Sequence, residues 1–164
     1  MNTTHIHLLL NHFPIIGTMI GSAILLYSII KKQNTGKITG AIIIIIMAII
    51  AIPVLLTGEP AEESIKHIKG ISKDLIHDHE ETSEKAFWLM VITAVISLLA
   101  LVLDKIRSAF APKAFLVAFG FSAITFFAMA WAGYLGGKIR HPEITNTYMN
   151  GEKGATNSQP ENAQ

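Results

Sequence analysis

The chain contains no cysteine and carries little charge. Without cysteine it can form no disulfide, no iron–sulfur ligand set, no thiolate metal site and no CxxCH attachment for c-type haem. Only 15% of the 164 residues are charged and the formal net charge is +1, which gives no basic surface for nucleic acid. GxGxxG, Walker and GxSxG motifs are absent as well. Nucleic-acid binding and the common nucleotide-dependent and serine-hydrolase activities therefore have no support.

Apolar residues are abundant instead, at 51% of the chain, and they gather in four long runs. The runs cover residues 8–30, 39–56, 86–103 and 114–135. A helix needs about 20 mostly apolar residues to cross about 30 Å of hydrocarbon, and lipid favours helix even for isoleucine-rich runs because backbone groups must pair internally. The sequence therefore predicts an all-α four-helix transmembrane bundle with up-down-up-down order in residues 1–143. Residues 144–164 are polar and aperiodic, which predicts a flexible tail.

The positions of lysine and arginine predict the orientation of the bundle. The two short loops, residues 31–40 and 104–113, carry six of these residues in 20 positions, whereas residues 1–7, 57–85 and 136–164 carry seven in 65. The more basic loops of a membrane protein usually remain in the cytoplasm. We therefore expect an inner-membrane protein with both termini and the long middle loop in the periplasm.

The middle loop, residues 57–85, predicts short extramembrane helices between the second and third spans. Pro60, followed by Ala-Glu-Glu, is typical of a helix start. Ser72 is placed to cap a second helix that could run unbroken into the third span. After the fourth span, Gly136 and Gly137 are expected to break the helix.

All seven histidines lie on the predicted outer side of the membrane. They are His5, His7, His12, His67, His77, His79 and His141. A rise of about 1.5 Å per residue, counted from the inner helix ends, places His5 level with His79 and His141. Two ligands of one haem iron must share a level, so His5 with His79 or His141 is the predicted pair. His12 lies deeper, near Glu59, with which it could relay protons or hold a quinone head group.

His12 stands out because it lies within the first apolar run, in the stretch NHFPIIGTMIG at residues 11–21. Ionisable groups at membrane depth usually face the bundle interior and serve a function. We therefore expect His12 to face inward and either to ligate a cofactor or to support one. Two local structures remain open: a helix that starts near His5 and bends at Pro14, or a helix that begins at Phe13.

Three segments resemble a family of uncharacterised bacterial four-span membrane proteins. They are HIHLLLNHFPIIG at residues 5–17, Thr57-Gly58-Glu59, and Tyr134-Leu135-Gly136-Gly137. The resemblance extends over residues 4–142, although the family's usual opening has His-Pro ahead of the second histidine and this chain does not. It implies the four-span fold and no settled activity. Small b-type cytochromes provide an analogy for histidine-bearing membrane bundles of four helices.

Three functions are compatible with these residues. The first is a subunit that binds haem b through residues among His5, His12, His79 and His141, for electron transfer to or from quinone. The second is a site for a bare transition metal, made by His5, His12 and His79 with the carboxylate of Glu80. The third is a structural or assembly subunit, or a homo-oligomer, packed through the GxxxG motif of Gly17 and Gly21. Whether the chain is an enzyme is left open.

Overall fold

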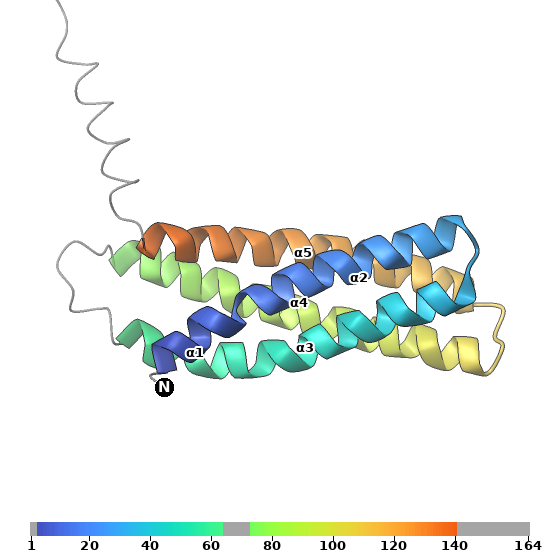
Figure 1. The fold of residues 1–164 in the computed structure, drawn as a ribbon, viewed down its shortest axis with the longest axis horizontal. Helices are drawn as coiled ribbons and strands as arrows, with labels where there is room; N and C mark the ends of the chain where they lie inside the picture. Colours follow the sequence, from blue (N-terminus) through green and yellow to red (C-terminus); the bar gives the residue numbers. More distant parts are fainter. Residues whose placement is uncertain (1–2, 64–72, 141–164) are drawn as a thin grey trace, which may run out of the picture.

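The computed structural model describes residues 3–63 and 73–140, which form five α-helices and no strand (Figure 1). The helices are α1 (Thr3–Leu10), α2 (His12–Ile30), α3 (Asn34–Glu63), α4 (Lys73–Lys105) and α5 (Ala111–Arg140). They lie along one long axis and alternate in direction. α1 and α2 follow one another and together form the first of the four long segments of the bundle. The predicted all-α four-helix bundle is confirmed.

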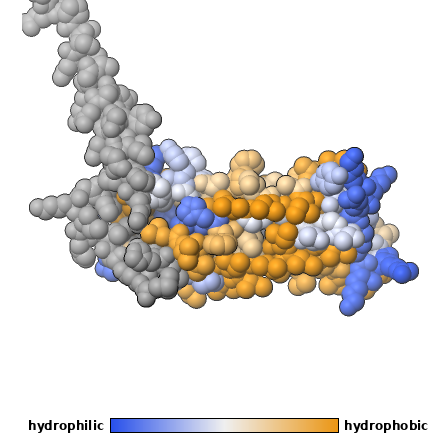
Figure 2. All heavy atoms as spheres, in the orientation of Figure 1, coloured by the Kyte–Doolittle hydropathy of each residue, from blue (hydrophilic) through white to orange (hydrophobic). Residues whose placement is uncertain are grey.

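Four helical segments are long and apolar enough to cross a membrane. They are His7–Ile30, Asn34–Ala61, Lys73–Lys105 and Ala111–Ile139. Large apolar side chains such as Ile49, Val95 and Phe127 are exposed on the outside of the bundle. Figure 2 shows this apolar surface as an orange band that ends in hydrophilic residues beside the helix-connecting turns. The chain is therefore a multi-pass membrane protein whose apolar surface contacts the lipid bilayer.

The first membrane-spanning segment bends between α1 and α2. Asn11 keeps helical backbone angles, and its N–H bonds to the carbonyl of His7 over 2.9 Å. Pro14 has no N–H for the carbonyl of Leu10, and its ring crowds that turn of the helix. The helix therefore starts before His5 and bends at Asn11, which is the first of the two structures that the sequence left open.

Two predicted helix boundaries are wrong. Pro60 does not begin a separate helix but lies inside α3, which runs on to Glu63. Gly136 and Gly137 do not end the last helix, because α5 continues to Arg140. Inside a helix, glycine lowers the stability by about 1 kcal/mol and proline by about 3 kcal/mol relative to alanine. A long helix that is fixed by packing against its neighbours tolerates this loss. The middle loop was also predicted to contain a helix that continues unbroken into the third span, and α4 confirms this. Ser72, His67 and the tail lie outside the described residues.

The two turns that connect the helices at one end of the bundle are built alike. Lys32 and Arg107 have positive φ angles of 55° and 54°. In each turn this residue donates its N–H to the carbonyl three residues earlier. The residue that follows it donates its N–H to the carbonyl five residues earlier, and all four bonds measure 2.9–3.2 Å. This is the Schellman arrangement that ends a helix. We refer to α1–α3 as the first hairpin, to α4–α5 as the second hairpin, and to the end opposite these turns as the histidine end.

Gly17 and Gly21 pack inside the chain. A side chain at Gly17 would overlap Met47 of α3, and a Cβ atom at Gly21 would lie 3.0 Å from Ile44 and 3.2 Å from the carbonyl oxygen of Gly40. The GxxxG motif therefore brings α2 and α3 together. Its predicted alternative use, as an interface to another subunit, is wrong because α3 already occupies that face.

The second hairpin packs through hydroxyl groups instead. The Oγ1 atoms of Thr93 on α4 and Thr125 on α5 lie 2.7 Å apart. Ser22 on α2 donates a hydrogen bond of 2.8 Å to Ser122 on α5. All four side chains are buried. Hydrogen bonds between helices therefore hold α5 against both α4 and α2.

Candidate functional site

Two half-buried histidines lie at the histidine end of the bundle, one in each hairpin. His7 on α1 places Nδ1 3.1 Å from the carbonyl oxygen of Val54 and 3.3 Å from Oγ1 of Thr57, both on α3. His79 on α4 places Nδ1 2.9 Å from the carbonyl oxygen of Ala132 on α5. Each ring thus lies against the neighbouring helix of its own hairpin. We refer to His7 and His79 as the His pair.

The hydrogen bonds of the His pair determine which nitrogen is free. A carbonyl oxygen can only accept a hydrogen bond, so Nδ1 of each ring carries the proton. Nε2 of each ring then keeps its lone pair, and it has no hydrogen-bond partner in the part of the chain that the structure describes. A backbone carbonyl on Nδ1 is also the arrangement that orients metal-bound histidines and makes Nε2 more basic.

The two hairpins contact their histidines in equivalent ways. Gly58 follows Val54 by four residues, and Gly136 follows Ala132 by four residues. A Cβ atom at Gly58 would lie 3.7 Å from Cε1 of His7, and one at Gly136 would lie 3.0 Å from Cε1 of His79. Each imidazole therefore rests on one carbonyl and on the glycine one helical turn beyond it.

Aromatic residues mark the level of the His pair in the membrane. Trp131 and Tyr134, on either side of Ala132, are 57% and 52% exposed, and their ring centroids lie 5.3 Å apart. Nζ of Lys138 lies 4.7 Å from the centroid of the Tyr134 ring. Exposed tryptophan and tyrosine beside lysine are typical of the membrane–water interface. The His pair thus lies where the apolar span ends.

Of the predicted cofactor residues that the structure describes, only His79 belongs to the His pair. His12 is exposed, so the predicted inward orientation is wrong. The physical reason is its register: Pro14 and Thr18 are buried, and His12 lies about 200° from Pro14 around the helix. The side chain of His5 and the whole of His141 lie outside the described residues.

The predicted carboxylates do not join the site. Glu59 and Glu80 are both exposed, so neither lies in the bundle interior with a histidine. Among the described residues, no three or more His, Asp or Glu side chains come together as a metal site. His77 is exposed as well, as expected for the opposite face of α4 from His79.

The sequence analysis missed His7, although a signal for it exists. His7 lies seven residues before the buried Pro14, which is about two helical turns, so both residues share a face. The prediction expected His12 to face inward instead, and it therefore did not extend the buried face of Pro14 back to His7.

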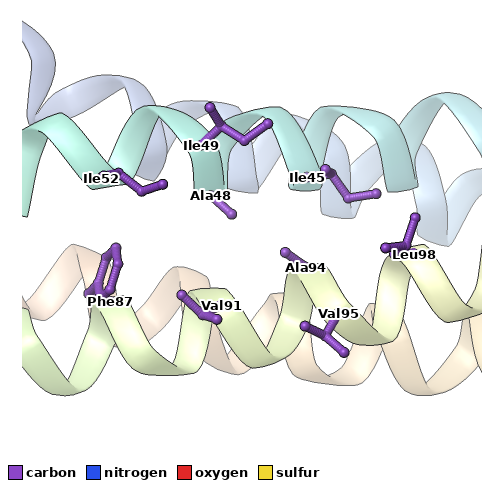
Figure 3. Close-up of a pocket in the computed structure, with 9 residues that line it drawn as sticks. All are labelled: Ile45, Ala48, Ile49, Ile52, Phe87, Val91, Ala94, Val95 and Leu98. Atoms are coloured by element: carbon purple, nitrogen blue, oxygen red, sulfur yellow. The ribbon is translucent and has the colours of Figure 1, made fainter.

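A separate hollow of about 250 Å³ lies between α3 and α4 (Figure 3). Its lining residues are Ile45, Ala48, Ile49, Ile52, Phe87, Val91, Ala94, Val95 and Leu98. Ala48 and Ala94 leave the space between larger neighbours. No lining residue can titrate or ligate a metal, so the polar chemistry of the chain gathers at the His pair.

Comparison of the chain with protein-family models, with curated proteins and with solved structures finds no match.

Proposed function

We propose that the chain is a membrane-embedded b-type haem protein for electron transfer, in which His7 and His79 hold the iron. One observation carries the proposal: two imidazoles from opposite hairpins each donate Nδ1–H to a backbone carbonyl and keep Nε2 free. Nε2 is a nitrogen that binds metals, and bundle interiors are common sites for non-covalent haem. When bound, the haem would supply one-electron transfer.

The number of ligands favours haem over a bare metal ion. Protein sites for zinc and similar ions take three or four protein ligands. Haem iron needs only two, because the porphyrin supplies the other four. Among the described residues no group of three or more His, Asp or Glu side chains is found, so a two-ligand site made by the His pair is easier to reconcile with haem than with a bare ion.

Two imidazole ligands also favour electron transfer over catalysis. If His7 and His79 both held the iron, the chain would leave no open position on it for a substrate. The level of the His pair, beside Trp131 and Tyr134, supports a redox centre near the membrane surface. A lipid-soluble quinone is therefore a suitable partner. The resemblance to the uncharacterised four-span family stays a prediction.

The lysine and arginine distribution supports an orientation with the His pair on the periplasmic side of an inner membrane. The absence of native cysteine makes this easy to test by labelling intact cells with a membrane-impermeant thiol reagent. The exposed Asp78→Cys should react and the exposed Gln33→Cys should not. The reverse pattern would invert the orientation.

The proposed function is tested by a reduced-minus-oxidised visible spectrum of the detergent-purified protein, with a pyridine haemochrome assay. We expect a b-type spectrum that His7→Ala and His79→Ala each abolish or convert to high spin. His12→Ala and His77→Ala are matched controls, because both histidines are exposed, and they should keep the wild-type spectrum. A folded protein that takes up no haem when titrated with it would end the proposal.

A further inference from the structure

Gly136 lies directly against the imidazole of His79. A Cβ atom at this residue would stand 3.0 Å from Cε1, 3.4 Å from Nδ1 and 3.5 Å from Nε2 of the ring. Because three ring atoms lie at nearly the same distance, the missing side chain would press on the imidazole itself. A side chain at position 136 would therefore require the imidazole to shift by a few tenths of an ångström.

We propose that Gly136 is a positioning residue that fixes the imidazole of His79, an inference that rests on the proposed haem site for its role. The carbonyl of Ala132, 2.9 Å from Nδ1, sets the direction of the ring nitrogen. Gly136 sets how closely the ring approaches the helix. Together they fix where Nε2 points, which is what an iron ligand requires.

The other glycines of the chain distinguish this role from general packing. Glycine is unfavourable inside a helix, so its presence there needs a reason. A Cβ atom at the adjacent Gly137 would meet nothing within 4 Å. At Gly58, the equivalent residue of the first hairpin, it would lie 3.7 Å from the ring of His7, which is ordinary contact. Of Gly58, Gly136 and Gly137, only Gly136 is therefore too close to a histidine ring for a Cβ atom to fit without movement.

The test compares three alanine variants, Gly136→Ala, Gly58→Ala and Gly137→Ala, in two measurements. The first is ¹⁵N-histidine NMR of the haem-free protein in detergent, which reports the tautomer and environment of the His79 ring. The second is haem titration. We expect Gly136→Ala to shift the His79 ring signals and to weaken haem binding by about 10–100-fold. Gly137→Ala should leave both unchanged, and Gly58→Ala should change them little.

A double-mutant cycle keeps the proposal testable if Gly136→Ala unfolds easily. Removal of the ring in His79→Ala also removes the clash, so Gly136→Ala should cost no stability in that background. If the loss of stability persists without the ring, or if Gly136→Ala leaves the His79 signals unchanged, the inference is wrong.

The two measurements also separate this inference from the proposed function. A wild-type protein that binds no haem, but whose His79 signals shift in Gly136→Ala, would end the haem proposal and retain Gly136 as the residue that positions His79. If the wild-type protein binds haem but Gly136→Ala changes neither haem binding nor the His79 signals, the haem proposal is retained and the role of Gly136 is wrong.

Discussion

The two hairpins place the same chemical group with differently built helices. His79 is carried by α4, an unbroken helix of 33 residues, whereas His7 is carried by α1, an eight-residue helix that precedes the bend at Asn11. Both rings nevertheless donate Nδ1–H to the paired helix of their own hairpin. The position of each imidazole is thus determined by contact with the neighbouring helix, and an uninterrupted helix is not required.

The hairpins also differ in how their helices approach each other. In the first hairpin the backbones touch: a Cβ atom at Gly40 would lie 2.8 Å from the carbonyl oxygen of Gly21 and 2.9 Å from the backbone nitrogen of Leu25. In the second, Thr93 and Thr125 meet through their hydroxyls. Close backbone packing has no room to adjust, whereas side-chain hydrogen bonds can rearrange, so the two hairpins should respond differently to substitution.

The largest effect is expected from Gly40→Ala in the first hairpin. The new methyl group would meet backbone atoms that cannot rotate away, so α2 and α3 must separate. Overpacking of this kind costs about 3 kcal/mol. The measurement is the free energy of unfolding in mixed detergent and SDS micelles.

Gly120→Ala on α5 is the matched control, because a Cβ atom there meets nothing within 4 Å. It should be neutral or stabilise the protein by up to about 1 kcal/mol through helix propensity. Equal losses for Gly40→Ala and Gly120→Ala would show that the close approach of α2 and α3 is not a feature of the folded protein.

A smaller loss is expected from Thr93→Val in the second hairpin. The change keeps the shape of the side chain and removes its hydroxyl, which leaves that of Thr125 without its partner. Hydrogen bonds between membrane helices are worth about 0.6–1.7 kcal/mol, so we expect a loss of about 1 kcal/mol. Thr39→Val is the control, because Thr39 is exposed and bonds within its own helix, over 3.0 Å to the carbonyl of Thr35. A cost as large as that of Gly40→Ala would contradict the distinction between the hairpins.

The sequence was sufficient to predict the four spans, because apolar length alone decides which segments cross a membrane. It was insufficient for the His pair. Counting residues gave the level of His79 but not its partner, since the bend at Asn11 makes the register of α1 depend on contact with α3. The depth of His12 did not reveal its direction: the buried Pro14 follows it by two positions, which turns His12 to the opposite face of the helix.

The smallest effect is expected where the hairpins are alike, at their turns. Lys32 and Arg107 both have left-handed backbone angles, which cost a residue with a side chain about 1 kcal/mol relative to glycine. Each also places a positive charge near a helix C-terminus, worth about 0.3–1 kcal/mol. Lys32→Gly and Arg107→Gly should therefore each stabilise the protein by only about 0.5 kcal/mol, and by similar amounts. Gains that differ by more than about 1 kcal/mol between the two turns would mean that the hairpins are not built equivalently at this end, and that their likeness is confined to the His pair.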